Sequence, residues 1–215
     1  MESTQHHTLL AIWWRVVLLW VPVLFVAYLD RVNLGFAALG GMNHALHLSN
    51  TQFGTAAGVF SFGYAAAGIP STVMLHRWGA RRWISLTMVV WGVCSGATAF
   101  VNQPAELYGI RVLLGMAEAG LAPGAVVYFS QWFPSEYRGR VFGTFFVINP
   151  ISQLIGGPLS SVLLNTDGWL GWAPWQWLFI IEAAPTLVLD STATMSAESV
   201  TRHAPWQPGR STRPA

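Results

Sequence analysis

Long apolar stretches dominate this chain and predict helices that cross a membrane. A helix needs about 20 predominantly apolar residues to span the bilayer. Six stretches reach that length: Trp14–Leu39, Gln52–Leu75, Trp83–Val101, Leu107–Phe129, Val141–Leu164 and Trp169–Leu189. Glycine, proline and polar residues interrupt the fifth and the sixth. We therefore expect an all-α membrane protein with six transmembrane helices.

Basic residues alternate between the ends of these spans and predict an orientation. They lie before the first span and in the connections after the second and fourth: Arg15, His76, Arg77, Arg81, Arg82, Arg138 and Arg140. The other three connections contain no Lys or Arg. The positive-inside rule then places both termini in the cytoplasm. The first apolar stretch is too long for a signal peptide and contains Asp30 and Arg31, so we expect a retained span.

The pattern divides the chain into three parts. Residues 1–13 form a cytoplasmic N-terminus, and residues 14–189 form the six-helix bundle. Residues 190–215 are rich in Ser, Thr, Pro and Arg and predict a disordered tail. Pairs of glycines four residues apart are candidates for close helix contact, although glycine is also simply common in membrane helices. These pairs are Gly54/Gly58, Gly92/Gly96, Gly120/Gly124 and Gly139/Gly143.

Composition supports a membrane protein and excludes other classes. Only 9% of residues are charged, whereas a soluble domain carries about 25%. The net charge of +2 is too small to indicate nucleic-acid binding. The single Cys excludes a disulfide within the chain. No span supplies a His to activate a Ser, so we expect neither an intramembrane protease nor another enzyme, and no cofactor. His44 and His47 alone do not make a metal site.

Five charged residues lie away from the ends of the predicted spans: Asp30, Arg31, Arg111, Glu118 and Glu182. A charge at mid-membrane costs about 2.5–3.5 kcal/mol on insertion scales. Such a residue needs a partner, a watery cavity or both. We interpret Glu182, which is followed by Pro185, as structural.

Asp30 and Arg31 are neighbours and point about 100° apart on a helix. Arg31 shares its face with Tyr28 and Gly35, and Asp30 shares its face with Asn33. Two polar sectors suit a helix that lines a cavity. The alternative is that each charge forms a buried pair with a neighbouring helix.

The fourth span contains RVLLGMAEAG, in which Arg111, Gly115 and Glu118 form one stripe. Arg111 and Glu118 are about 10 Å apart along the axis, too far for simple neutralisation. The first and fourth spans thus present acid and arginine at similar depth, as in inverted three-helix repeats of transporters. Arg holds an anion, and a carboxyl in low dielectric can exchange a proton. This combination suits an anionic substrate coupled to protons.

Five segments resemble the major facilitator superfamily of transporters, and more narrowly its anion:cation symporter branch: YLDRVNLGFA, HRWGARRW, RVLLGMAEAGLAPG, WFPSEYRGR and WQWLFIIEAAP. Members of that branch take up tartrate, phthalate, hexuronates, aldonates and similar organic anions. The resemblance covers residues 12–189. It implies symport of an organic anion with protons, with Na⁺ as the alternative coupling ion, across a bacterial inner membrane.

The resemblance also implies roles for individual residues. Substrate binding falls to Tyr28, Arg31, Arg111 and Asn149. Proton coupling falls to Asp30 and Glu118. Arg77, Gly79, Arg81 and Arg82 are expected to form a cytoplasmic gate, although His76 stands where the family usually has Asp. Asn149, with Ser152 and Gln153, could equally make hydrogen bonds between helices.

The family has twelve spans in two six-span halves, and this chain resembles the first half. We therefore expect a truncated transporter with an aberrant tail. Two alternatives stay open: an inactive structural remnant, or a half-transporter that assembles with itself or with a separate second half.

Overall fold

The computed structural model describes residues 2–132, 135–165 and 169–186, and these are helical almost throughout. The elements are α1 (Glu2–Leu39), α2 (Met42–Ala45), α3 (Asn50–Trp78), α4 (Ala80–Thr98), α5 (Pro104–Glu118), α6 (Leu121–Trp132), α7 (Ser135–Leu164) and the 3₁₀-helix η1 (Trp169–Gly171). A last helix, here called the terminal helix, covers residues 174–186. The tail predicted for residues 190–215 lies outside the described residues.

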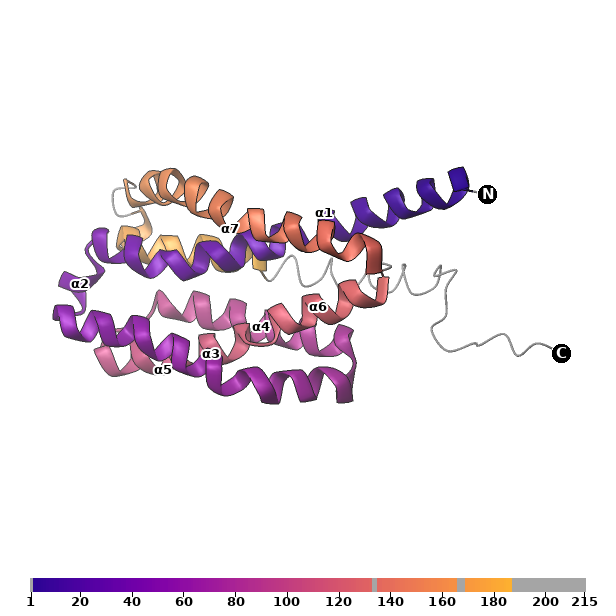
Figure 1. The fold of residues 1–215 in the computed structure, drawn as a ribbon. Coiled ribbons are helices and arrows are strands. Elements are labelled where there is room, and N and C mark those ends of the chain that lie inside the picture. Colours follow the sequence, from indigo (N-terminus) through magenta and orange to yellow (C-terminus); the bar gives the residue numbers. More distant parts are fainter. Residues whose placement is uncertain (1, 133–134, 166–168, 187–215) are drawn as a thin grey trace.

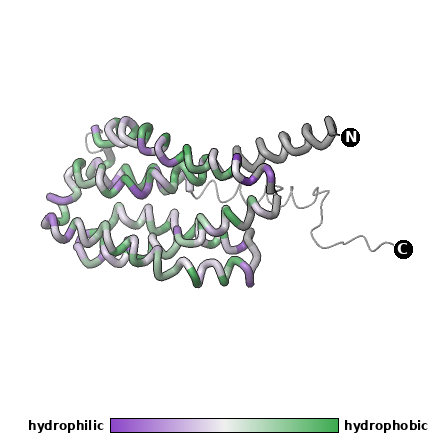
Figure 2. Tube along the Cα trace, in the orientation of Figure 1, coloured by the Kyte–Doolittle hydropathy of each residue, from purple (hydrophilic) through white to green (hydrophobic). Residues whose placement is uncertain are grey.

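The helices form a bundle in two groups (Figure 1). Helix α1 packs along α7, whereas α3 and α4 both pack along α5. Hydropathic colouring shows apolar residues along the helices and hydrophilic ones gathered near their ends, with a hydrophilic interruption inside the coloured part of α1 (Figure 2). That interruption brings polar chemistry between the two groups of helices.

Four described helical segments are long and apolar enough to cross a membrane: Trp20–Leu39, Asn50–Trp78, Pro104–Val126 and Arg138–Leu164. They correspond to the first, second, fourth and fifth predicted spans. Within the described residues, the third and sixth predicted spans are not among them. Helix α4 has 19 residues, and the terminal helix is described only as far as residue 186.

The fourth predicted span, Leu107–Phe129, corresponds to the candidate span Pro104–Val126, but its helix is interrupted. The chain turns at Ala119–Gly120 and starts again as α6. Pro123 has no N–H, and its ring would clash with the carbonyl of residue 119 in a continuous helix. As the third residue of α6, Pro123 lacks a donor that would have no partner inside that helix anyway.

The terminal helix begins later than the predicted span at Trp169. Residues 169–171 form η1, in which Leu170 and Gly171 have φ angles of +59° and +80°. These left-handed conformations end the 3₁₀ turn before the helix over residues 174–186 begins. Pro174 stands at its first position, where proline is favoured.

Only some of the predicted glycine contacts exist. No atom lies within 4 Å of the position that a Cβ would take on Gly54, Gly58, Gly139 or Gly143. The pair Gly120/Gly124 does lie against α3 and α4. The closest approach instead joins α3 and α5, where Gly63 faces the backbone of Val112 and Gly115 faces the backbone of Phe60. Spacing alone therefore did not identify the glycines that matter.

Candidate functional site: a charged cluster between α1, α4 and α5

An ion pair joins the first predicted span to the fourth. The Nε of Arg31, on α1, donates to the Oε2 of Glu118, on α5, at 2.7 Å. The Glu118 side chain is 1% exposed, whereas that of Arg31 is 39% exposed. The pair thus has one buried partner and one partner that reaches solvent-accessible space. This confirms that the two residues lie at similar depth.

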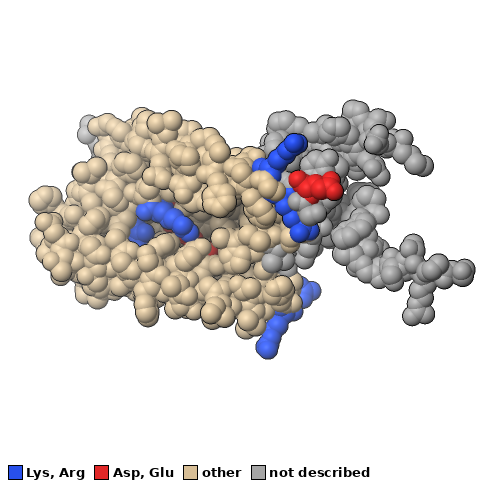
Figure 3. All heavy atoms as spheres, in the orientation of Figure 1, with Lys and Arg blue, Asp and Glu red and all other residues tan. Residues whose placement is uncertain are grey.

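Three aromatic rings surround the Arg31 guanidinium. Its Cζ lies 5.8 Å from the ring centroid of Tyr28, 5.8 Å from that of Phe60 and 5.1 Å from that of Tyr64. Rings at this range attract a cation through their negative faces. They hold the guanidinium in place while one side of it stays open. The space-filling view shows basic atoms in a hollow of the molecule, with acidic atoms just behind them (Figure 3).

Asp30 points away from this hollow, toward α4. Its Oδ1 accepts a hydrogen bond from Ser95 Oγ at 2.6 Å, and its Oδ2 accepts one from Trp91 Nε1 at 3.2 Å. The residue is 2% exposed. Asp30 and Arg31 therefore serve different faces of α1, as the 100° offset predicts. The two donors satisfy both oxygens of this buried carboxyl group.

Arg111 is buried near the same place, and two of its nitrogens have no hydrogen-bond partner among the described residues. It is 2% exposed, and the two nitrogens are Nε and Nη2. Its charge interacts with those of Asp30 and Glu118. The amide of Asn33, which is fully buried, is also without partners. Buried polar groups of this kind are normally satisfied by water or a ligand, so the interior here is suited to holding one of them.

The remaining predicted site residues are not drawn into this cluster. The Oδ1 of Asn149 accepts a hydrogen bond from Gln153, 2.6 Å away on the same helix. This is neither a contact with Arg31 nor a bond between helices. Arg77 and Arg82 are exposed on either side of Gly79. The structure does not describe the side chain of Arg81.

The α3–α4 connection nevertheless has a defined geometry. Gly79 ends α3 and begins α4, with φ +83° and ψ 149°. Residues with a Cβ rarely adopt this conformation. The backbone conformation thus explains why a glycine stands at this position of the predicted gate motif, whereas it does not explain the arginines.

Sequence reasoning missed four neighbours of the charges: Phe60, Tyr64, Trp91 and Ser95. Ser95, a polar residue inside the third predicted span, is a hydrogen-bond donor to Asp30. The only available signal was a polar or aromatic residue inside an apolar span. The described residues contain no group of three or more His, Cys, Asp or Glu that could hold a metal ion.

Membrane-spanning helices that bury arginines and carboxylates between them are typical of transporters. The sequence comparisons agree. The profile of the Major Facilitator Superfamily matches residues 20–211. The chain therefore belongs to the Major Facilitator Superfamily, a family of membrane transporters and not of enzymes.

The relatives include transport proteins of bacteria and fungi. The chain is 47% identical over 175 residues to a protein of Agrobacterium vitis named "Putative tartrate transporter". The aligned region covers 81% of this chain and 40% of the relative. It is 36% identical over 170 residues to the "Inner membrane transport protein RhmT" of Escherichia coli, with 78% of this chain and 39% of the relative covered. The chain thus spans about two fifths of the length of these relatives.

Solved structures support the fold. The proton:xylose symporter XylE matches with a TM-score of 0.74 at 14% identity, over 88% of this chain and 49% of that one. A bacterial homologue of the lysosomal transporter Spinster matches with a TM-score of 0.69 at 21% identity, over 84% of this chain and 42% of that one. The helical arrangement is that of half of a major facilitator protein.

Proposed function

We propose that this chain forms the N-terminal half of a transporter that carries a small organic anion, a carboxylate or a sugar acid, by proton symport. The observation that carries the proposal is the pair between half-exposed Arg31 and buried Glu118. The similarity to a protein named for tartrate is consistent with a carboxylate substrate. We place the chain in a bacterial inner membrane with both termini in the cytoplasm.

The chemistry of the pair suits an exchange of partners. Glu118 uses one N–H of Arg31, and the guanidinium has four other donors. A substrate carboxylate in the hollow could take those donors in a bidentate contact. If Glu118 accepts a proton, it no longer competes for Arg31. Proton uptake and anion binding then favour each other, which is the thermodynamic basis of symport.

We assign supporting roles to the other residues of the cluster. Tyr28 lies beside the guanidinium and would line the anion site. Arg111 would supply a second positive charge, because its Nε and Nη2 have no partner. Asp30 is a second candidate for proton coupling, with Na⁺ as the alternative ion. Asn149 would join the site only after a rearrangement that brings α7 toward Arg31.

The α3–α4 connection is our candidate for a cytoplasmic gate. Exposed Arg77 and Arg82 flank Gly79, and Arg81 follows it. Arginines at a helix end could pair with acidic groups or carbonyls of another helix and close one side of the cavity.

Uptake by purified protein in proteoliposomes tests the proposal. Labelled tartrate and a labelled sugar acid are offered with an inward proton gradient. Arg31→Ala should abolish uptake, whereas Arg140→Ala, an exposed arginine at the start of α7, should leave it unchanged. Unchanged uptake in Arg31→Ala would contradict the assignment of Arg31 to the anion site. An uptake signal that ignores the proton gradient would refute symport with protons.

A half-transporter that assembles with a second six-helix half is the main alternative arrangement. It is favoured by the fraction of its relatives that the chain covers, about two fifths. Crosslinking in membranes should then show a dimer or a complex. If only monomer is found and no anion is bound, the chain is better described as an inactive structural bundle.

A further inference from the structure

Glu182 is a buried carboxyl for which the proposed mechanism has no use. It lies in the terminal helix and is 5% exposed. Neither of its carboxyl oxygens has a hydrogen-bond partner. An isolated carboxylate in such surroundings is strongly disfavoured, and the usual response is to bind a proton.

Contacts of the terminal helix place Glu182 beside the charged cluster. Gln176 Nε2 donates to the carbonyl of Ala99, just beyond α4, at 2.7 Å. A Cβ added to Gly96 of α4 would lie 3.3 Å from the Cβ of Ala183. On the side of α5, the ring of Phe179 lies 6.0 Å from the Cζ of Arg111. Glu182 is one helical turn beyond Phe179, so it shares that inward face.

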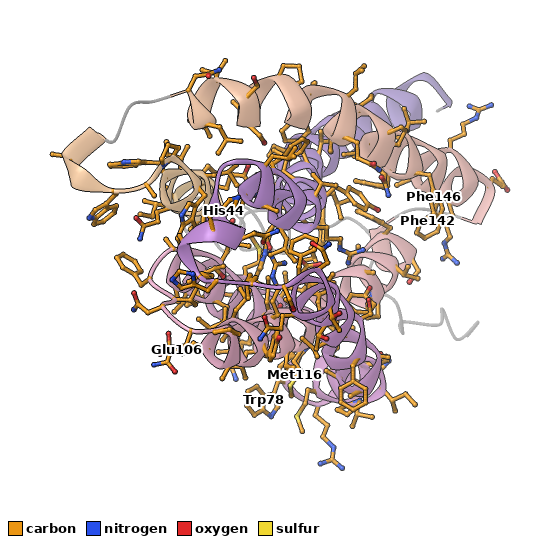
Figure 4. The ribbon with its side chains drawn as sticks, turned by 90° about the vertical axis from the view of Figure 1, so that its left-hand side faces the viewer. His44, Trp78, Glu106, Met116, Phe142 and Phe146 are labelled. Atoms are coloured by element: carbon orange, nitrogen blue, oxygen red, sulfur yellow. The ribbon has the colours of Figure 1, made fainter. Side chains whose placement is uncertain are left out.

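Asp30 links Glu182 electrostatically to titratable groups of α4 and α5. Asp30 itself belongs to α1 and interacts with Glu182. Helix α5 brings Arg111 and Glu118, both of which also interact with Asp30. Helix α4 contributes the thiol of Cys94, which interacts with Asp30 as well. Asp30 is thus the common neighbour of the cluster. Seen along the bundle, nitrogen- and oxygen-bearing side chains meet in its middle (Figure 4).

Asp30 and Glu182 have contrasting surroundings. Asp30 has two hydrogen-bond donors and the nearby positive charge of Arg111. Glu182 has no donor among the described residues and interacts with the carboxyl group of Asp30. Two buried carboxyls that interact do not readily ionise together, and Glu182 is the one of the two without a hydrogen-bond donor.

We propose that Glu182 holds a proton in this conformation. Glu182 is then a third proton-carrying residue of the site. The idea deepens the proposed proton coupling and rests on it for its role in transport, but the protonation itself is measurable without transport.

Infrared spectroscopy of the full chain in lipid nanodiscs tests this directly. A protonated carboxylic acid has a carbonyl stretch that a carboxylate and an amide lack. At neutral pH we expect that band in the wild type, its loss in Glu182→Gln, and its retention in Glu118→Gln. In Asp30→Asn the band should change frequency, because an amide replaces the neighbouring carboxyl group. Absence of an acid band, or a band that Glu182→Gln keeps, would overturn the proposal.

Isotope labelling of the wild type keeps the test independent of the variant's folding. Incorporation of ¹³C-glutamate should move the acid band, because Glu118 and Glu182 are the buried glutamates of the described residues. A band that does not move belongs to an aspartate and contradicts the proposal. A failure of the proposed function has a different signature, since Arg31→Ala would then leave uptake unchanged whatever the infrared result.

Discussion

The contact between α3 and α5 gives the sharpest prediction about packing. Gly115 lies on α5 between the two charged residues Arg111 and Glu118. A Cβ at this position would overlap the carbonyl oxygen of Phe60, and would lie 2.9 Å from the backbone nitrogen of Tyr64. These are backbone atoms, so no side-chain rotation can relieve the overlap. Gly115→Ala must therefore push the two helices apart.

The size of the effect follows from that geometry. Non-bonded carbon atoms prefer separations of about 3.5–4.0 Å, so the helices must separate by about 1 Å. Inserting a methyl group into a well-packed interface costs about 1–3 kcal/mol. By the scaling for soluble domains of this size, the loss lowers Tm by roughly 2–12 °C. The separation also moves Phe60 and Tyr64 away from Glu118 and its partner Arg31.

Circular dichroism during heating of the detergent-solubilised protein measures this effect. Gly109→Ala is the matched control, because Gly109 lies on the same helix with no atom within 4 Å of its Cβ position. We expect the control to keep the Tm of the wild type or exceed it slightly, since Ala favours a helix more than Gly does. If Gly115→Ala and Gly109→Ala melt at the same temperature, the inferred contact is wrong.

Three further predictions concern hydrogen bonds and charges. Arg31→Met should destabilise the fold by about 3–5 kcal/mol in chemical denaturation, because it leaves buried Glu118 without its ion-pair partner. The double variant Arg31→Met/Glu118→Gln should regain most of the lost stability. A double variant that is no more stable than Arg31→Met would contradict this prediction. Ser49→Ala removes the side-chain acceptor of the capping box at the start of α3. We expect the free energy of unfolding to fall by about 0.5–2 kcal/mol in the same assay. An unchanged free energy of unfolding would show that this cap does not stabilise the fold. Gln176→Leu breaks the bond to Ala99 and should cost about 1–3 kcal/mol, with faster hydrogen exchange in the terminal helix as a second measure; unchanged exchange would show that the bond does not anchor this helix.

The sequence predicted the parts of the site that follow from helical geometry. The adjacent charges Asp30 and Arg31 had to point to different sides of one helix. The structure shows this, with Asp30 directed to α4 and Arg31 to α5. The cost of buried charge also predicted that each would need a partner or water. The cavity and the buried-pair interpretations were posed as alternatives, and the Arg31–Glu118 pair shows features of both.

The sequence could not predict which residues of other helices come close. Tyr64 lies 33 positions from Arg31 and Trp91 lies 61 positions from Asp30 along the printed chain, and no periodicity links such distant residues. The same holds for glycines. Gly54 and Gly58 have the spacing of a packing motif but face open space, whereas Gly63 contacts Val112. Which face of a helix packs against a neighbouring helix depends on the arrangement of the whole bundle, and residue spacing within one helix does not predict that face.

The break between α5 and α6 has a meaning for the charged cluster. Glu118 is the last residue of α5, and Gly120 follows it closely. A Cβ on Gly120 would lie 2.5 Å from Ser71 Oγ and 2.9 Å from Trp83 Nε1, so this turn is pressed against α3 and α4. The Ser71 and Trp83 side chains are themselves joined by a 2.8 Å hydrogen bond. The carboxyl of the ion pair thus sits at a helix end that two other helices hold in place. A movement of α3 or α4 would reach Glu118 through that turn, and through Glu118 it would reach Arg31.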